Sequence, residues 1–114
     1  AGTSLVSTVD PLRIFDSRSV GGVGQVAVPV QVAGLGGVPA GATSAMLALT
    51  LVTGEQATSV FAHPCNEGYG SGNAVAVQPN RVTTAVVPVR LSGGQVCITS
   101  IKPANVIVDV VGAG

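Results

Sequence analysis

Charged and aromatic residues are scarce in this chain of 114 residues. Only 9% of the residues are charged, five basic and five acidic, so the formal net charge is zero. A chain without a basic surface cannot neutralise a run of phosphates, which argues against a nucleic-acid partner. Aromatic residues make up 3% and tryptophan is absent, so a core has to be built from small side chains. No apolar run approaches the roughly 20 residues of a membrane-spanning helix, and we expect no membrane span.

Motifs for catalysis or metal binding are also missing. A nucleophile pair of Cys65 and the single histidine, His63, is conceivable, because alternate residues on a strand face the same way. No nucleophile elbow, zinc-protease motif or phosphate-binding loop occurs, however. No loop has the several acidic residues of a calcium site, and Glu55 and Glu67 give no sign of a glycosidase pair. We therefore expect no metal, no cofactor and no enzymatic activity.

Valine and glycine dominate what is present, with 22 valines and 16 glycines. Branched side chains favour strands, and glycine together with proline marks the turns between them. Strands are expected at residues 5–9, 12–18, 25–32, 44–53, 58–62, 74–77, 82–91, 95–101 and 105–111. This spacing predicts one domain over residues 1–114, an all-β antiparallel sandwich of jelly-roll type with eight or nine short strands. Pro29 has no N–H, so the strand at 25–32 is expected to be bulged or to lie at a sheet edge.

The two cysteines, Cys65 and Cys97, lie in separate strand-like segments. Neither has a second cysteine or a histidine at metal-ligand spacing, so a disulfide is the favoured interpretation. It would close a loop of about 33 residues and stabilise the fold by roughly 3–4 kcal/mol. Two buried free thiols are the alternative.

Three of the ten charged residues, Arg13, Asp16 and Arg18, fall within residues 11–18. A further acid, Asp109, lies in the most apolar segment of the chain, where a lone buried carboxylate would be costly. We expect Arg13 or Arg18 to pair with Asp109, so that these four residues form a structural ion-pair network between the first and last strands. Breaking a buried pair typically costs roughly 3–5 kcal/mol. A ligand-binding or catalytic role for the cluster is the alternative.

The loop at residues 64–73 is the best candidate for ligand binding. Its side chains Asn66, Glu67 and Asn73 can form hydrogen bonds with sugar hydroxyl groups, and Tyr69, the only tyrosine, can stack on a sugar ring. The alternative is a glycine-rich surface loop whose polar residues are merely solvated.

Four segments follow one another in a recognisable order along almost the whole chain. They are Asp-Pro-Leu-Arg-Ile-Phe-Asp-Ser-Arg at 10–18, Val-Pro-Ala-Gly-Ala-Thr at 38–43, His-Pro-Cys at 63–65 and Val-Ile-Val-Asp-Val-Val-Gly at 106–112. Together they resemble a repeat domain of secreted actinobacterial proteins, which starts with Pro-x-Arg-(apolar)₂-Asp-Thr-Arg and ends with Val-Ile-Val-Asp-x-x-Gly. The chain departs from that pattern at Ser17, at Ala48 and in its last three residues, and so resembles a divergent member.

The resemblance implies a secreted or cell-surface protein with a β-rich fold, serving as an accessory module beside cell-wall, glycan-processing or surface proteins. It implies no particular ligand. Two classes of function follow. The first is a non-catalytic extracellular module that binds polysaccharide or cell-wall glycan through the Tyr69 loop. The second is a structural module that self-associates into a symmetric homo-oligomer, because few charges keep its copies apart. A hydrolase is the third possible class of function.

Overall fold

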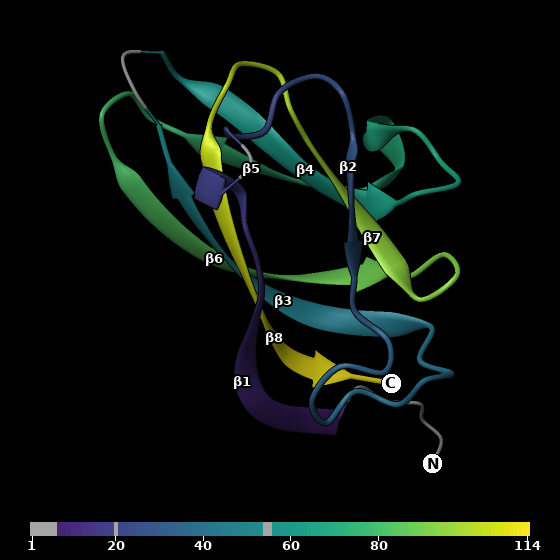
Figure 1. Ribbon diagram of the computed structural model, residues 1–114. Helices are drawn as coiled ribbons and strands as arrows, with labels where there is room; N and C mark the ends of the chain where they lie inside the picture. The colour runs from purple at the N-terminus through teal and green to yellow at the C-terminus, as the bar shows by residue number, and fades with distance from the viewer. Residues whose placement is uncertain (1–6, 20, 54–55) are drawn as a thin grey trace.

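Eight strands make up most of the computed structural model, which describes residues 7–19, 21–53 and 56–114 (Figure 1). The strands are β1 Ser7–Asp16, β2 Val28–Gln31, β3 Ser44–Val52, β4 Thr58–Pro64, β5 Asn73–Val77, β6 Val82–Arg90, β7 Gln95–Ser100 and β8 Asn105–Ala113. Two short 3-10 helices, η1 Ser17–Ser19 and η2 Tyr69–Ser71, follow β1 and precede β5. In the described part of the chain, neither helix has the length and apolar character that crossing a membrane requires.

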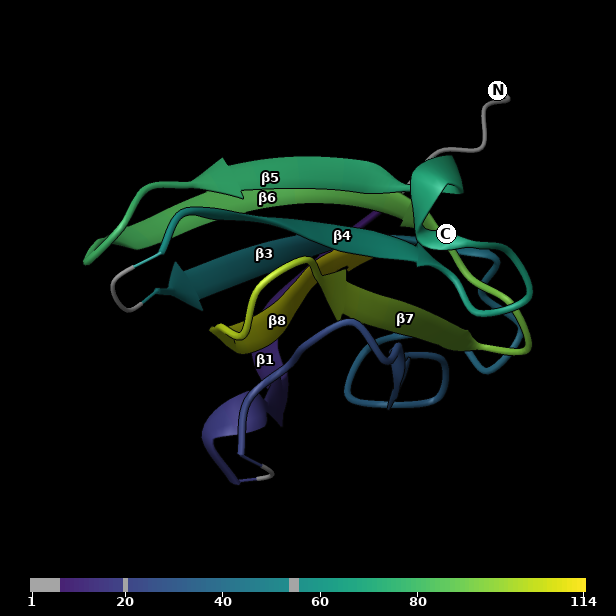
Figure 2. The ribbon, with the colours of Figure 1, turned by 90° about the horizontal axis from the view of Figure 1, so that it is seen from above.

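The strands pair in a nested order. β1 pairs with β8, β2 with β7, β3 with β6 and β4 with β5, each time antiparallel. Further pairing of β3 with β8 and of β4 with β7 joins them into two sheets, β1-β8-β3-β6 and β2-β7-β4-β5. The sheets lie face to face as two layers (Figure 2). This order is that of a long antiparallel hairpin rolled into two layers, so the predicted sandwich of jelly-roll type is confirmed.

The core lies between the two sheets and consists of aliphatic side chains. In β3, Ala45, Leu47, Leu49 and Leu51 have no exposed surface, and the residues between them face outward. The neighbouring and opposite strands contribute mainly valines to the same core, namely Val60, Val87, Val89, Val96, Val106, Val108 and Val110, together with Ile98. Small branched side chains from two facing sheets can interdigitate closely, so the core closes without tryptophan.

The first strand is longer than expected. One strand, β1, covers most of the segments expected as two strands at 5–9 and 12–18, of which residues 5 and 6 lie outside the described part. Register shifts between Thr8 and Leu12 and between Arg13 and Phe15 allow β1 to continue along β8. Pro11 is tolerated because β1 lies at the edge of its sheet, where no donor is required on the open side. Residues 17 and 18 form η1 instead of extending the strand.

The strand expected at 25–32 is shorter in the structure. Only Val28–Gln31 forms β2, which lies at a sheet edge and so confirms the expectation for Pro29. Residues 25–27 are not a strand, and Val26 is 82% exposed despite its place in the alternating pattern. The physical reason lies in β7, because the Ser100 N–H donates to the Gly24 carbonyl oxygen at 2.9 Å and leaves residues 25–27 looped away from the sheet.

Candidate functional site

The loop between β4 and β5 is tied to its sheet at several points. A disulfide between Cys65 and Cys97 joins the beginning of the loop to β7, with the two Cα atoms 4.9 Å apart, which confirms the predicted pairing. Cys97 is the register partner of His63 in the ladder between β4 and β7. The disulfide therefore holds the loop against strands that are already neighbours.

His63 is buried and forms hydrogen bonds through both ring nitrogens. Nδ1 lies 3.0 Å from the carbonyl oxygen of Pro64 and 3.1 Å from that of Glu67, and Nε2 lies 2.9 Å from Thr99 Oγ1. Carbonyl oxygens only accept hydrogen bonds, so Nδ1 carries the proton of the neutral ring and Nε2 accepts from the Thr99 hydroxyl. His63 thereby holds the loop backbone at Glu67 in place.

This arrangement leaves Cys65 without a free thiol. The sulfur of Cys65 is in the disulfide, so the alternative of a nucleophile pair formed by Cys65 and His63 is wrong. His63 is 3% exposed, and the contacts of its two nitrogens are made within the protein. Within the described ranges, no group of three histidine, cysteine, aspartate or glutamate side chains is placed to hold a metal ion.

The far end of the loop is held by close packing. A Cβ atom at Gly72 would lie 2.1 Å from the Ala62 carbonyl oxygen and 2.6 Å from His63 Cβ, so only glycine fits there. Earlier in the loop, the ring of Tyr69 packs on that of Phe61 from β4, with ring centroids 4.8 Å apart. Tyr69 nevertheless remains 47% exposed. The loop is thus attached to its sheet near its beginning, in its middle and at its end.

Two adjoining hollows open where this loop meets the ends of β3 and β6. Their volumes are about 280 Å³ and about 330 Å³, and Ser44, Pro64 and Arg90 line both. Asn73 lines the first hollow, and Asn66 and Glu67 line the second. We refer to the two hollows together as the end groove.

A salt bridge spans the end groove from one sheet to the other. Arg90 is the last residue of β6, and its Nη2 lies 3.1 Å from Oε1 of Glu67 in the loop that follows β4. The side chains are 66% and 35% exposed, and ion pairs this exposed typically stabilise a protein by about 1 kcal/mol or less. A ligand that replaces this contact therefore loses little. A second link between the sheets comes from Asn73, whose Nδ2 donates to the Pro88 carbonyl oxygen.

Three of the four predicted binding residues meet at the end groove. Asn66, Glu67 and Asn73 line it, whereas Tyr69 lines neither hollow and instead lies against Phe61. Sequence reasoning missed Arg90. Its signal was the scarcity of charge, since Arg90 ends a strand that has no other charged residue.

The four residues of the predicted ion-pair network form two separate pairs on the outer face of the β1-β8-β3-β6 sheet. Nε of Arg13 donates to Oδ1 of Asp109 at 3.2 Å, which links the first strand to the last. Arg18 binds Asp16 through Nε at 2.9 Å and through Nη2 at 2.7 Å. An arginine thus pairs with Asp109 as expected, but both pairs are partly exposed, so the roughly 3–5 kcal/mol typical of breaking a buried pair does not apply. Asp109 faces outward beside Ala48, and the side chains of Arg13 and Asp109 are 56% and 27% exposed, so about 0.2–1 kcal/mol is the appropriate range.

The ion pair of Asp16 and Arg18 at the end of β1 lowers the pKa of the Asp16 carboxyl group. The pKa of Asp16 is lowered from 3.8 to about 2, first by the hydrogen bonds from the Arg18 side chain and then by the one from the Arg18 backbone N–H. The pKa of Arg18 is raised by the same contact. Because the pKa of Asp16 is lower in the folded state, the pair stabilises the fold above pH 3.8, and this contribution is lost as the pH falls through about 2.

We expect Arg18→Gln to move the titration midpoint of the Asp16 carboxyl group from about 2 towards 3.8. The backbone N–H of residue 18 still donates in this variant, so the return should be incomplete. Carboxyl carbon chemical shifts recorded by NMR across acidic pH measure the midpoint. Arg81→Gln is the control, because Arg81 immediately precedes β6 and is not among the groups that shift the pKa of Asp16. This variant should leave the midpoint near 2. A midpoint that Arg18→Gln leaves unchanged would contradict the assignment.

Comparisons of the chain with protein-family models, with curated proteins and with solved structures gave no match. The resemblance to the actinobacterial repeat domain therefore stays a prediction. The function has to be inferred from the end groove and from the surface of the molecule.

Proposed function

We propose that the protein is a non-catalytic extracellular or cell-surface module that binds carbohydrate or cell-wall material in the end groove. One observation supports this most directly. A cross-linked loop of one sheet and a strand end of the other hold Glu67 and Arg90 around one opening, with Asn66 beside them. The proposed ligand is a chain of sugars that presents several hydroxyl groups at once.

The polar groups of the end groove match the chemistry of sugar hydroxyls, which both donate and accept hydrogen bonds. The Glu67 carboxylate accepts, the Arg90 guanidinium donates, and the Asn66 amide does both. The charges of Glu67 and Arg90 cancel, which suits an uncharged polysaccharide. Hollows of about 280 Å³ and about 330 Å³ lie side by side and offer room for two successive sugar units.

The order of the loop supports binding of a weak, flexible ligand. Any side chain or loop that becomes fixed on binding reduces affinity, because its lost freedom opposes association. Here the disulfide, the hydrogen bonds of His63 and the packing at Gly72 already hold the loop. Tyr69 in the same loop presents a half-exposed ring, on which a further sugar unit could stack.

The extracellular part of the proposal rests on the disulfide. Disulfides form and persist in oxidising surroundings, such as the outside of a cell, and are rare in the cytosol. The bond between Cys65 and Cys97 holds the very loop that lines the end groove. The resemblance to a domain of secreted proteins points the same way.

We expect Arg90→Ala to weaken polysaccharide binding by about tenfold or more, since hydrogen bonds to a charged group typically contribute about 1.5–3 kcal/mol. Arg81→Ala is the matched control, because it removes the same kind of side chain from the residue just before the other end of β6. Mobility in native gels that contain purified cell-wall polysaccharides measures the affinity. Retardation of the wild type and of Arg81→Ala, but not of Arg90→Ala, is the expected result.

Tyr69 needs a milder substitution than alanine, because its ring also packs on Phe61 and its loss would disturb the loop. Tyr69→Phe keeps the ring and should retain binding. Two results would overturn the proposal. One is that no polysaccharide retards the wild type, and the other is that Arg90→Ala and Arg81→Ala bind equally well.

A further inference from the structure

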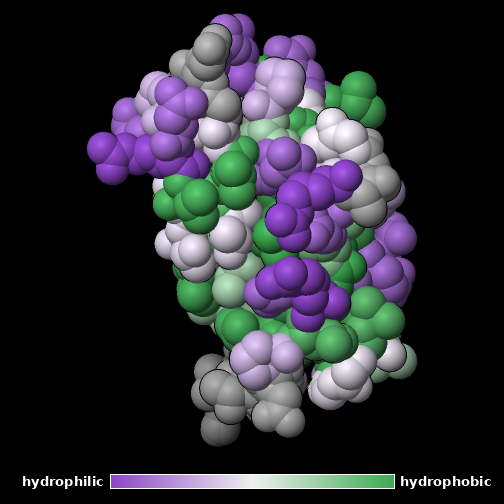
Figure 3. Space-filling model, turned by 60° about the vertical axis from the view of Figure 1, so that its left-hand side comes forward, coloured by the Kyte–Doolittle hydropathy of each residue, from purple (hydrophilic) through white to green (hydrophobic). Residues whose placement is uncertain are grey.

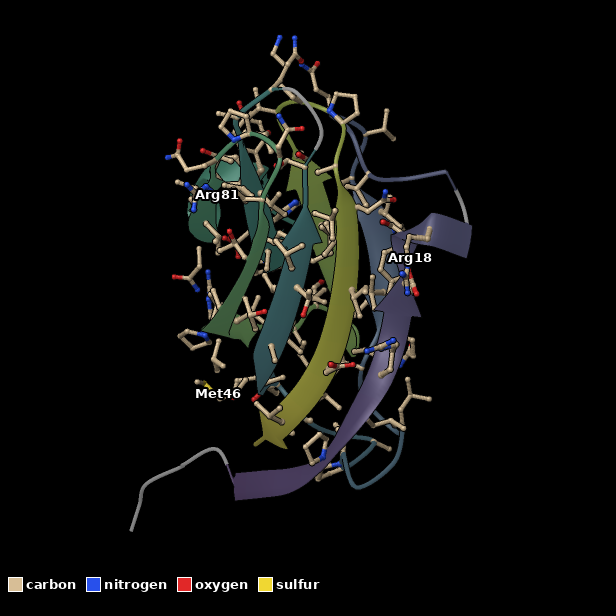
Figure 4. All side chains as sticks on the ribbon, turned by 90° about the vertical axis from the view of Figure 1, so that its left-hand side faces the viewer. Arg18, Met46 and Arg81 are labelled. Carbon is tan, nitrogen blue, oxygen red and sulfur yellow. A yellow bond between two sulfur atoms is a disulfide. The ribbon has the colours of Figure 1, made fainter. Side chains whose placement is uncertain are left out.

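The outer face of the β1-β8-β3-β6 sheet has a half, formed by β3 and β6, whose only charged side chain within these strands is Arg90 at the end of β6, and we call it the uncharged half. Figure 4 views this face with its four strands side by side, Met46 and Arg81 lying on the β6 side and Arg18 on the β1 side. Its outward side chains are Met46, Ala48, Thr50, Val52, Val82, Thr84, Val86 and Pro88, with Ser44 and Arg90 at its end, where Arg90 is paired with Glu67. Val82 and Val86 are 67% and 55% exposed. Apolar side chains that gather on one open face are typical of an interaction surface.

The other half of the face, formed by β1 and β8, carries the two ion pairs. Arg13 and Asp16 both face outward from β1, opposite Asp109 and Ile107 respectively. They are three residues apart in β1, but the register shift between Arg13 and Phe15 sets them opposite residues two positions apart on β8, so they lie about 7 Å apart along the strand. On this side of the molecule the space-filling view shows purple hydrophilic groups set among green and white surface (Figure 3). The charges along β1 thus alternate beside an uncharged area.

We propose that this face binds the same face of a second copy of the chain, forming a two-fold symmetric dimer. The two-fold axis would lie between the facing sheets of the two copies, parallel to the plane of these sheets. It would run perpendicular to the strands and pass midway between Arg13 and Asp16. This axis places β6 on the partner's β6 and β1 on the partner's β1, running in opposite directions. The same surface of both copies is then in contact, as a two-fold symmetric interface requires.

Charge complementarity selects a second copy as the occupant and also selects this axis. With it, Arg13 faces Asp16 of the partner subunit, and Asp16 faces Arg13 of the partner subunit. The uncharged halves meet each other as well. A two-fold axis parallel to the strands would instead set β6 against the ion pairs of β1, which would bury charges against valines.

The size of the face predicts a reversible dimer. Strands of nine residues spaced about 4.8 Å apart give four strands a footprint of roughly 550 Å². Two such faces therefore bury roughly 1,100 Å² in total or somewhat more, near the lower limit for specific interfaces. We expect monomer at micromolar concentration and dimer as the concentration approaches millimolar.

Sedimentation velocity from micromolar to millimolar concentration tests the proposal with two matched variants. Val86→Glu introduces a charge into the uncharged half and should weaken dimerisation by about tenfold or more, since desolvated or like charges oppose association. Val26→Glu makes the same change at an 82% exposed valine that precedes β2 of the other sheet, and should have no effect. Circular dichroism verifies that both variants fold. A wild type that stays monomeric throughout, or a dimer that Val86→Glu leaves intact, overturns the proposal.

A charge exchange tests the orientation of the two copies. Arg13→Glu alone and Asp16→Lys alone should each dimerise poorly, because each homodimer would contain two like-charge contacts. An equimolar mixture should recover dimerisation, because the new glutamate of one variant then faces the new lysine of the other, while the remaining contact is the wild-type pair of Arg13 and Asp16. Recovery in the mixture supports the proposed axis, and its failure rejects that axis. Neither variant touches the end groove, so these outcomes are independent of carbohydrate binding.

Discussion

Replacing both Cys65 and Cys97 with alanine is expected to lower the free energy of unfolding by about 3–4 kcal/mol. The disulfide joins residues 32 positions apart and so restricts the unfolded chain over a long loop. For a domain of this size, with a total stability of about 5–15 kcal/mol, the loss is a large fraction. The core between the sheets remains, so the double variant should still fold at low temperature.

Urea denaturation followed by circular dichroism measures this loss. The midpoint should fall, and the slope of the transition should rise because the unfolded double variant is less restricted and exposes more surface. Reducing the disulfide of the wild type should produce the same change, which controls for the alanine substitutions. A midpoint equal to that of the oxidised wild type would show that the bond does not constrain the fold. The same variant should bind polysaccharide less tightly even where it is folded, since its loop is released.

Gly72→Ala is expected to lower the free energy of unfolding by about 1–3 kcal/mol, the range typical of overpacking. The added Cβ would lie 2.1 Å from the Ala62 carbonyl oxygen, and backbone cannot move aside as the end of a flexible side chain can. Gly72 has φ −105° and ψ −172°, values that alanine adopts readily, so the clash alone is responsible. The end of the loop, where it joins β5, should therefore be displaced.

Gly68→Ala is the matched control for this change. Gly68 also has extended backbone angles, and a Cβ atom there would meet nothing within 4 Å, so its stability should change by about 0.5 kcal/mol or less. NMR shifts of the His63 ring report whether the loop has moved, because His63 Cβ lies 2.6 Å from the added atom. Displacement should also weaken polysaccharide binding in Gly72→Ala only. Equal stability of the two variants would contradict the close packing at Gly72.

The local pattern of the chain determined its class of fold and the place of the candidate loop at residues 64–73. The neighbouring β-branched residues Thr50, Val52 and Thr53 favoured a strand over residues 44–53, although residues 45–49 could form a helical fragment by propensity, and the structure has the strand. With only two cysteines in the sequence, an intramolecular disulfide had one possible pairing. The loop was marked because the only tyrosine, Tyr69, stands there beside Asn66, Glu67 and Asn73. Each of these inferences depends on neighbouring residues or on composition.

What each strand lies beside was decided only by the tertiary structure. The apolar residues around Asp109 suggested that its side chain is buried, yet the register of Asp109 with Ala48 places that side chain on the outer face. Val26 was expected in a strand, but the hydrogen bond from Ser100 to Gly24 leaves it outside β2. Glu67 and Arg90 form a salt bridge although they are 23 positions apart in the sequence and adjoin strands of different sheets. The physical reason is that side-chain periodicity records which residues share a face, whereas the partner of that face depends on pairings between distant segments. The strands, the disulfide and the loop therefore follow from the sequence, whereas the pair of Arg13 with Asp109 and the uncharged half need distant strands to pair, and the end groove needs the two layers to close.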